Sequence, residues 1–171
     1  MDRFRAEPRL PPDERAELAD YRGSGLDRGH LAPAGDMATA QAQAESFSLA
    51  NMAPQDPDLN RGRWERVEDA TRKLAARHGE AYVVTGVAFR GQALRRVGGR
   101  VLVPTHLFKA VYVPGRGAAA YVAENAPGRG YSRVPVAEVE ALAGFAVFPG
   151  MPAADRGKLL ALPAPKERKR R

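Results

Sequence analysis

The chain has 171 residues, 44% of them hydrophobic, which is enough for one domain with a substantial core. No apolar run approaches the roughly 18 residues of a membrane-spanning helix. The sequence does not open with an apolar segment like that of a secretory signal. The absence of cysteine excludes disulfides and thiolate–zinc sites. The net charge is +7, from 27 basic and 20 acidic residues, so the chain is moderately basic and lacks the charge density of a strong polyanion trap.

The first third of the chain is predicted to be mostly loop, because proline and glycine recur in it. We expect one helical turn at Asp13–Ala19, a short strand over Leu26–Leu31 and a helix in the alanine- and glutamine-rich segment Met37–Ala44. The apolar segment Phe47–Met52 is predicted to end at the breaking sequence Pro54–Pro57.

The longest predicted element is a helix from Asn60 to about Arg77. Good helix formers fill it, proline is absent from it, and His78–Gly79 supplies a stop signal. The next segment, Ala81–Phe89, is rich in β-branched and aromatic residues and is predicted to be a buried strand.

Hairpins dominate the predicted second half. Gly98–Gly99 is the strongest turn signal in the chain and predicts a hairpin over Leu94–Val103. One helix is expected at Val136–Ala143, with Pro135 near its first turn. Further strands are expected at Phe108–Val113, Ala118–Ala123 and Phe145–Phe148. This mixture of helices and hairpins predicts the α+β class.

The end of the sequence, residues 163–171, is predicted to be a basic, disordered tail that follows a single domain over residues 1–162. Five of the six residues from Lys166 to Arg171 are basic. Such a segment either contacts phosphates without sequence preference or is a solvated end, and the sequence favours neither interpretation.

The decapeptide Asp27–Asp36, DRGHLAPAGD, combines groups that phosphodiester cleavage needs. A histidine such as His30, with an ordinary pKa of about 6.5, can take a proton from water at neutral pH. Arg28 can stabilise charge on phosphoryl oxygens, and Gly29 between them allows a backbone conformation that a side chain would forbid. A lone histidine is more often an ordinary core or surface residue, so this motif needs support elsewhere in the chain.

A second candidate set lies on the longest predicted helix. Asn60, Trp64, Glu68 and Arg72 are four residues apart, and each step of four turns an α-helix by only about 40°. An amide, a carboxylate and a guanidinium are therefore expected near one helix edge. An amide oxygen is a hard neutral ligand that suits Mg²⁺, which keeps most of its waters. The plainer interpretation is an N-cap asparagine followed by a Glu68–Arg72 ion pair.

Two blocks of sequence together resemble the DNA/RNA non-specific endonucleases, the family of Serratia nuclease and endonuclease G. The first block is DRGH, within YRGSGLDRGH. The second, NMAPQDPDLNRGRWERVEDATRK from Asn51 to Lys73, carries the family's Asn, Pro–Gln, Leu–Asn, Trp and Glu in register. The segments ESFSLANMAPQ and AYVVTGVAF agree as well, and the resemblance covers roughly residues 2–155.

The resemblance implies the ββα-metal, or His-Me finger, fold, with a central antiparallel sheet flanked by helices. At matching positions it also implies roles for three residues. His30 matches the general base, and Asn60 matches the protein side chain that ligates Mg²⁺ directly. Glu68 matches the carboxylate that holds a metal-bound water and assists the leaving group.

Three more residues match positions around the scissile phosphate of the family. Arg28 and Arg72 match arginines near that phosphate. Asn51 matches an asparagine near the active site that supports either the histidine or the phosphate. The six matched residues together form the candidate catalytic and metal-binding set.

The implied activity is that of a Mg²⁺-dependent, sugar-non-specific endonuclease that uses a single metal ion, with Mn²⁺ or another divalent ion as an alternative. Its substrates are DNA and RNA, double- or single-stranded, and its products carry 5′-phosphate and 3′-hydroxyl ends. A site that contacts only the backbone has little sequence preference. Two other functions stay open at this stage: a catalytically silent nucleic-acid-binding module of the same fold, and an interaction protein whose helix face binds a partner.

The resemblance also bears on partners and location. Family members are often dimers and are often exported, periplasmic or mitochondrial, so a homodimer and a protein inhibitor are candidate partners, a membrane is not, and the location of this chain is undetermined. Members usually carry several tens of residues before the segment that matches DRFRAEPRL. We therefore expect an N-terminal edge strand to be missing from this sequence.

Overall fold

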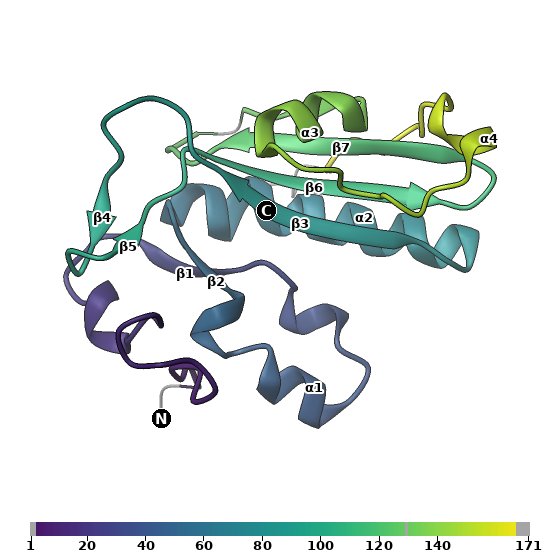
Figure 1. Ribbon diagram of the computed structural model, residues 1–171. Helices are drawn as coiled ribbons and strands as arrows, with labels where there is room; N and C mark the ends of the chain where they lie inside the picture. The colour runs from purple at the N-terminus through teal and green to yellow at the C-terminus, as the bar shows by residue number, and fades with distance from the viewer. Residues whose placement is uncertain (1–2, 129, 167–171) are drawn as a thin grey trace, which may run out of the picture.

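The computed structural model describes residues 3–128 and 130–166 (Figure 1). A four-stranded antiparallel sheet in the order β3–β6–β7–β8 forms its middle layer, with helix α2 on one face and helix α3 on the other. This arrangement confirms the α+β class. The bounds are Tyr82–Ala88 for β3, His106–Val113 for β6, Gly117–Glu124 for β7, Ser132–Val134 for β8, Glu65–His78 for α2 and Val136–Ala143 for α3.

Strand β6 lies in the centre of this layer and is buried on both faces. Val111 packs in a cluster with Val67 and Leu74 of α2, while Phe108 packs in a cluster with Val139 of α3. Because successive side chains of a strand point to opposite faces, a strand covered on both sides needs a continuous apolar run. The sequence of β6 has such a run apart from one buried lysine, Lys109, and this explains why the strand was predictable.

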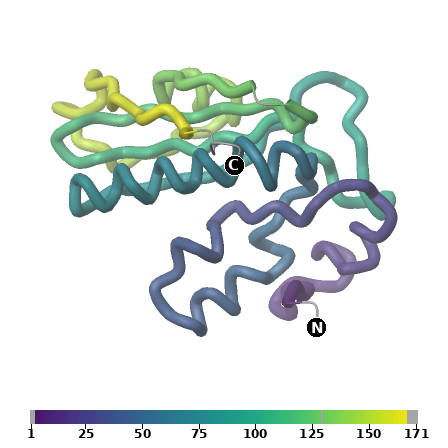
Figure 2. The backbone as a smooth tube through the Cα atoms, turned by 180° about the vertical axis from the view of Figure 1, so that it is seen from behind, coloured from purple at the N-terminus to yellow at the C-terminus, as the bar shows by residue number. Residues whose placement is uncertain are grey.

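The DRGH residues lie outside the main sheet, in a second antiparallel pair beside α2. Strand β1 is paired with strand β2 over four residues each, and the short helix α1 follows on the same side of α2 (Figures 1 and 2). A small core of Tyr21, Leu49 and Met52, with Phe4 against it, stabilises this part. The bounds here are Asp27–His30 for β1, Met52–Gln55 for β2, Ala40–Glu45 for α1, and Leu18–Tyr21, Ala34–Asp36 and Leu49–Asn51 for the 3₁₀ turns η1, η2 and η3.

The predicted hairpin around Gly98 is present and connects the two parts of the molecule. It consists of β4, Arg96–Val97, and β5, Val101–Leu102, and it extends from the sheet toward the loop before β1 (Figure 1). Arg100 forms a 3.1 Å ion pair with the buried carboxylate of Asp20, in η1 just before that loop. This contact fixes the loop that leads into the DRGH strand.

Helix α4 spans Ala153–Arg156. The segment that follows it packs against the face of the sheet that α2 covers. Leu160 and Leu162 are buried in the cluster beneath α2, and the hydroxyl of Tyr121 donates a 2.6 Å hydrogen bond to the carbonyl of Pro163. Packing therefore continues past the predicted domain boundary at residue 162. The greater part of the predicted tail, residues 167–171, lies outside the described residues.

Three predictions for the first half of the chain are wrong in detail. The helical turn lies at Leu18–Tyr21 instead of Asp13–Ala19. Pro54 does not break the chain but lies inside β2, because a strand with one neighbour leaves half of its backbone groups without ladder partners and tolerates proline. Strand β3 is at an edge of the described sheet, and Tyr82 on it is 53% exposed, so full burial of this strand was wrong.

Two differences concern the second half. Phe145–Phe148 forms no strand; Val147 and Phe148 instead pack as an irregular segment against the cluster around α3. The sequence does not predict β8 or α4, because segments of three and four residues are too short to show a periodicity. In the described part of the chain, no helix combines the length and the apolar composition that a membrane crossing requires.

Gly29 is the point where the β1–β2 pair leaves no room for a side chain. A Cβ placed on it would lie 2.0 Å from Oε1 of the fully buried Gln55. We expect Gly29→Ala to lower the free energy of unfolding by about 1–3 kcal/mol through overpacking. The same substitution should cost less in a Gln55→Ala background, which removes the contacts to Oε1 and Cδ and keeps only the one to Cβ. Thermal and urea unfolding measure both effects. Gly62→Ala is the matched control, since a Cβ there meets open space; an equal loss in both backgrounds would contradict the steric explanation.

Candidate active site

His30, the last residue of β1, lies between two aromatic rings. Its ring centroid is 5.8 Å from that of Phe4 and 4.9 Å from that of Phe47. Its Nε2 atom is buried and has no hydrogen-bond partner among the described residues. Burial lowers the pKa of His30 below its ordinary value, because desolvation disfavours the charged imidazolium. The imidazole is therefore neutral at neutral pH and able to accept a proton.

Arg28 lies on the same face of β1 as His30, since side chains two residues apart on a strand point the same way. Its guanidinium carbon is 4.2 Å from the ring centroid of Phe4, which is a cation–π distance. One phenylalanine ring thus contacts both the arginine and the histidine of the DRGH motif.

Asn51 supports the loop that follows His30. Its Oδ1 accepts a 3.0 Å hydrogen bond from the backbone N–H of Ala32, and its Nδ2 donates 2.9 Å bonds to the carbonyls of Ala32 and Ser46. Its own carbonyl accepts a 2.9 Å bond from the backbone N–H of Leu31. Both polar atoms of the side chain are thereby engaged, and the geometry favours support of the histidine over contact with a phosphate.

Asn60 lies in a π-helical turn, Leu59–Trp64, that leads into α2. Its Nδ2 donates a 2.9 Å hydrogen bond to Asp27, the residue before Arg28. An ionised carboxylate only accepts hydrogen bonds, so Asp27 directs the amide nitrogen toward itself and leaves Oδ1 as the atom that can ligate a metal. The plainer N-cap interpretation of Asn60 is wrong, because the carboxylate of Asp56 caps this helix by accepting two backbone N–H groups.

Asp27 also binds Arg61 through two hydrogen bonds, of 2.8 Å from Nε and 2.6 Å from Nη2. Such a two-point contact between a guanidinium and a carboxylate fixes the direction as well as the distance of both groups. The carboxylate that orients Asn60 is therefore itself held in place by the neighbouring residue on the helix.

Glu68, two turns after Asn60, is largely buried on α2. Burial raises its pKa to about 7, and the cations of Lys109 and Arg72 partly oppose that rise. Lys109 is 1% exposed and comes from the middle of β6, where its ammonium donates a hydrogen bond to Thr85 of β3. Its pKa is lowered by burial and raised by Glu68. A buried carboxyl group and a buried amine therefore share one electrostatic environment between α2 and the sheet.

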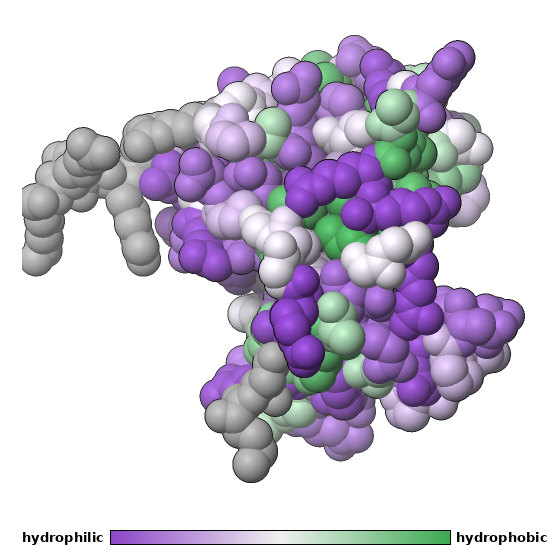
Figure 3. All heavy atoms as spheres, turned by 90° about the vertical axis from the view of Figure 1, so that its left-hand side faces the viewer, coloured by the Kyte–Doolittle hydropathy of each residue, from purple (hydrophilic) through white to green (hydrophobic). Residues whose placement is uncertain are grey.

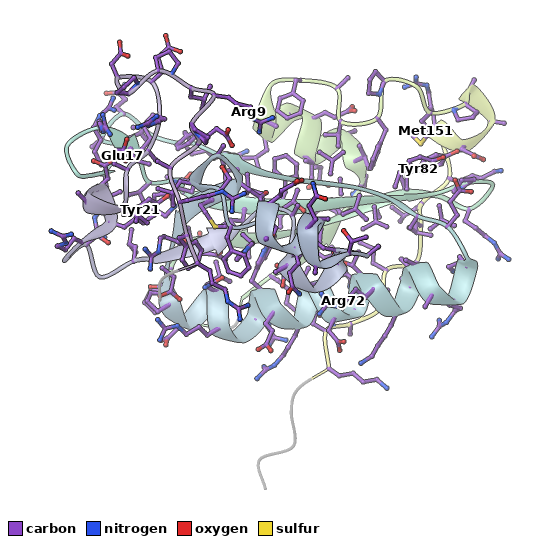
Figure 4. All side chains as sticks on the ribbon, turned by 90° about the horizontal axis from the view of Figure 1, so that it is seen from below. Arg9, Glu17, Tyr21, Arg72, Tyr82 and Met151 are labelled. Atoms are coloured by element: carbon purple, nitrogen blue, oxygen red, sulfur yellow. The ribbon has the colours of Figure 1, made fainter. Side chains whose placement is uncertain are left out.

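Arg72 pairs with Asp36 and not with Glu68. Its Nη1 lies 2.8 Å from Oδ1 of Asp36, and both side chains are about one-third exposed, at 36% and 34% (Figure 4). The predicted Glu68–Arg72 ion pair is therefore replaced by a contact that joins α2 to the far end of the DRGHLAPAGD segment.

The DRGHLAPAGD segment links two groups of predicted residues: Arg28, His30, Asn51 and Asn60 around Asp27–Ala32, and Glu68 with Arg72, which binds Asp36. Arg28 and Asn60 line the same pocket, and Phe4, which also lines it, contacts His30. Glu68 and Arg72 follow on α2, and their charges act on each other. Sequence reasoning missed the supporting residues, namely Phe4, Asp27, Asp36, Phe47 and Lys109. The signals available were the two aspartates that bracket the decapeptide and a lysine inside an apolar strand.

The donor set was tested against a divalent metal ion. Among the described residues, no three His, Cys, Asp or Glu side chains gather into a metal-binding cluster. Mg²⁺ does not need such a cluster, since it keeps several waters and binds proteins through one or two oxygen ligands. The oriented amide oxygen of Asn60 and the carboxylate of Glu68 fit that requirement. They do not fit a zinc site with three or four protein ligands.

With this geometry established, the chain was compared with known proteins. The family model described as DNA/RNA non-specific endonuclease matches residues 1–154. The chain belongs to this family. The family resemblance seen in DRGH and in the Asn51–Lys73 block is thereby confirmed.

Relatives and solved structures agree with this membership of the DNA/RNA non-specific endonucleases. Nuclease C1 of Cunninghamella echinulata var. echinulata is 35% identical over 179 residues, which cover 93% of this chain and 71% of that protein. Mitochondrial endonuclease G of Homo sapiens is 38% identical over 139 residues, which cover 72% of this chain and 47% of that protein. Mitochondrial nuclease 1 of Schizosaccharomyces pombe is 36% identical over 182 residues, which cover 91% and 56%.

The crystal structure of the EndoG/EndoGI complex, which addresses how EndoG is inhibited, matches with a TM-score of 0.80 at 29% identity, over 94% of this chain and 77% of that chain. The match confirms the predicted ββα-metal fold. The present chain spans about half the length of several of its relatives, and several of those relatives are named as mitochondrial. What each relative acts on is a property of that relative.

The raised pKa of Glu68 has a consequence for stability in the absence of metal. Its carboxyl group has a pKa of about 7 in the folded chain, against an ordinary value of 4.5. At pH values between these two pKa values, folding is coupled to the uptake of a proton. The free energy of unfolding therefore falls as the pH rises through this range. At about pH 8, Glu68→Gln removes a buried charge and is expected to stabilise the metal-free chain by on the order of 3 kcal/mol.

Urea unfolding with a chelator present, at about pH 5 and about pH 8, measures this difference. At the lower pH the wild-type side chain is already neutral, so the two proteins should be nearly equal. Glu65→Gln, an exposed position on the same helix, is the matched control. A Glu68→Gln variant less stable than the wild type at the higher pH would contradict the burial explanation.

Proposed function

We propose that the chain is a divalent-metal-dependent endonuclease that hydrolyses phosphodiester bonds of DNA and RNA to 5′-phosphate and 3′-hydroxyl ends. The observation that carries this proposal is one site that combines a histidine kept neutral by burial with an asparagine amide oriented by Asp27. Family membership supplies the reaction class. A one-metal nuclease needs a base that activates water and a ligand that holds the metal ion. In this proposal His30 on β1 is the base, and Asn60 in the turn before α2 is the ligand.

Mg²⁺ is the ion that the proposed donor set suits best, and Mn²⁺ or another hard divalent ion has similar ligand preferences. Asn60 would hold it through Oδ1, and Glu68 through a water. When bound, the ion supplies positive charge beside the phosphate and the departing 3′-oxygen. Loss of a proton from Glu68 accompanies binding, so the affinity for the ion falls as the pH drops below about 7.

His30 acts as the general base in this proposal. Because Nε2 is buried, Nδ1 is the ring nitrogen that takes a proton from the attacking water. The new bond from water oxygen to phosphorus forms while the bond from phosphorus to the 3′-oxygen breaks. The 3′-oxygen takes its proton from a water that Glu68 positions, and the hydroxide left there takes up the proton that His30 releases to solvent. Arg28, together with Arg72 from α2, would stabilise negative charge on the phosphoryl oxygens.

Asn51 has a positioning role in this mechanism. The three hydrogen bonds of its side chain hold the backbone at Ala32 and Ser46, and so they fix the direction in which His30 leaves its strand. A catalytically silent binding module of the same fold is the alternative function, and the first experiment below separates the two. The solved complex of EndoG with EndoGI supports a protein inhibitor as a candidate partner, alongside DNA, RNA and a second copy of the chain.

His30→Ala should abolish cleavage while leaving binding intact. Loss of a general base costs about 10²- to 10⁴-fold in rate, and the small substitution leaves Arg28 and the metal ligands in place. Release of fragments from plasmid DNA and from RNA, with Mg²⁺ or with EDTA, measures activity. Arg116→Ala, in the turn between β6 and β7 at the other end of the sheet, is the control. A folded wild-type protein that cuts neither substrate in Mg²⁺ would leave the silent module as the function.

Asp27→Asn should weaken metal binding without a direct change of ligand. An asparagine at position 27 offers both a donor and an acceptor, so the amide of Asn60 is no longer held in one orientation. We expect Mn²⁺ affinity, measured by calorimetry on the free protein, to fall about 10-fold or more, as for other residues that orient metal ligands. Asn60→Ala should lose at least as much, and the double variant no more than Asn60→Ala alone.

The control for this experiment is Arg61→Gln, which removes the two-point ion pair but keeps Asp27 beside Asn60. It should bind Mn²⁺ within a few-fold of the wild type, since Arg61 orients the carboxylate and not the amide. If Asp27→Asn and Asn60→Ala have fully additive effects, Asp27 is itself a ligand and its proposed orienting role is wrong.

A further inference from the structure

A pocket of about 570 Å³ is lined by Arg28 and Asn60, and its lining does not include His30 or Glu68. Its volume lies in the range that binds small organic molecules or one nucleotide unit. Tyr21 and Arg22, at the end of η1, also line it, and the proposed mechanism assigns no role to these two residues. The pocket therefore shares residues with the proposed cleavage site and contains others that need their own explanation.

The pocket is positively charged. Arg22, Arg28 and Arg61 line it, against one acidic residue, Asp27. The two-point ion pair with Arg61 already engages the charge of Asp27. Arg22 is exposed, and none of the described carboxylates forms a salt bridge with it. An excess of cations in a concave surface concentrates an anionic ligand there.

The pocket also has an aromatic wall with an unpaired hydroxyl group. Phe4 and Tyr21 both line it. Tyr21 is 7% exposed, and its hydroxyl is buried without a hydrogen-bond partner among the described residues. Buried hydroxyl groups are normally hydrogen-bonded, so an unpaired one on a residue that lines a pocket is suited to a ligand that completes the bond. Burial raises the pKa of Tyr21 to about 12, so the group stays protonated and can donate.

Figure 3 looks at the end of the molecule where β4, β5 and the loop before β1 lie, and hydrophilic residues cover most of this face. Figure 4 shows Tyr21 at this end, and Tyr82 and Met151 at the opposite end. The end of the molecule that carries Tyr21 is therefore largely hydrophilic.

We propose that this pocket is a subsite for the nucleotide that adjoins the scissile phosphodiester bond. Arg22 contacts the phosphate of that nucleotide, the hydroxyl of Tyr21 donates a hydrogen bond to it, and the rings of Phe4 and Tyr21 pack against its sugar or base. The inference rests on the proposed function, because it takes Arg28 and Asn60 as the place of cleavage. These contacts read phosphate and shape and not base edges, so the subsite adds affinity without sequence preference.

The test measures binding separately from cleavage. A fluorescein-labelled single-stranded oligonucleotide is titrated with the full chain carrying His30→Ala, in EDTA, and its anisotropy is followed at several salt concentrations. Adding Arg22→Ala should weaken binding about 3- to 10-fold and reduce the magnitude of the slope of log K against log salt by about 0.7, the value for one lost phosphate contact with a single strand. Arg61 is not used, because its loss also frees the charge of Asp27 at the pocket wall.

Arg116→Ala is the matched control, since it removes the same charge from an exposed turn at the other end of the sheet. Arg116→Ala should leave the oligonucleotide affinity and the salt slope of the His30→Ala chain unchanged within error. Tyr21→Phe should weaken binding about 3-fold, in line with one neutral hydrogen bond, and should leave the melting temperature unchanged, since the hydroxyl has no partner in the free chain. In the active background, Arg22→Ala should raise KM by the same factor as it weakens binding and change kcat less than twofold.

Two outcomes overturn the subsite: equal effects of Arg22→Ala and Arg116→Ala, or no oligonucleotide binding by the His30→Ala parent. These are distinct from failure of the proposed function. A wild-type chain that does not cleave, but loses affinity specifically with Arg22→Ala, keeps the binding pocket and loses the catalytic proposal. A wild-type chain that cleaves normally, with Arg22→Ala behaving like Arg116→Ala, keeps catalysis and loses the subsite.

Discussion

The two aspartates that bracket the DRGHLAPAGD segment hold the site together. Asp27 at its start binds Asn60 and Arg61, and Asp36 at its end binds Arg72. Arg61 and Arg72 are separated by roughly 16 Å along a helix at 1.5 Å per residue. The segment that carries His30 is thus attached to the helix at two distant points. Two attachments fix an orientation that one would leave free to rotate, and His30 and Asn60, the proposed base and the proposed metal ligand, keep their relative position as a result.

Charge is distributed around Glu68 in a way that no single element determines. Arg72 comes from its own helix, Lys109 from the centre of the sheet, and Asp36 from the loop after β1. Burial favours the neutral carboxyl group, and the two cations favour the carboxylate, so the outcome depends on contributions from three elements. A buried lysine in the middle of an apolar strand is costly unless it serves such an electrostatic balance.

The sequence predicted the parts of the fold that depend on local signals. The long helix and the Gly98–Gly99 hairpin rest on helix propensity and turn chemistry, and both are present. The prediction that Pro54 breaks the chain was wrong, because a strand accepts proline when it has a single neighbouring strand. Strand β2 has one neighbour, β1, and only the tertiary structure shows this. Phe145–Phe148 misled because an apolar run of four residues is equally suited to a strand and to an irregular segment packed on a core.

The candidate site shows the same division. Motif spacing identified His30, Asn60 and Glu68, since the two blocks could be matched position by position. The partners of these residues could not be read in that way. Asp27 and Asn60 are 33 residues apart, and Asp36 and Arg72 are 36 apart, so only the folded chain shows that they meet. The sequence therefore predicts the candidate reactive groups, and the structure shows which residues contact and orient them.

The packing of residues 160–163 under α2 has a consequence for how the protein is made. All six candidate site residues lie between positions 28 and 72, so a ribosome releases them long before Leu160 and Leu162 complete the cluster that supports α2. Synthesis from the N-terminus at about 5–20 residues per second separates the two events by several seconds or more. During that interval the nascent chain carries every candidate site residue but lacks part of the core beneath α2. The order of the chain thus delays full support of the candidate site until residues 160–163 have been made.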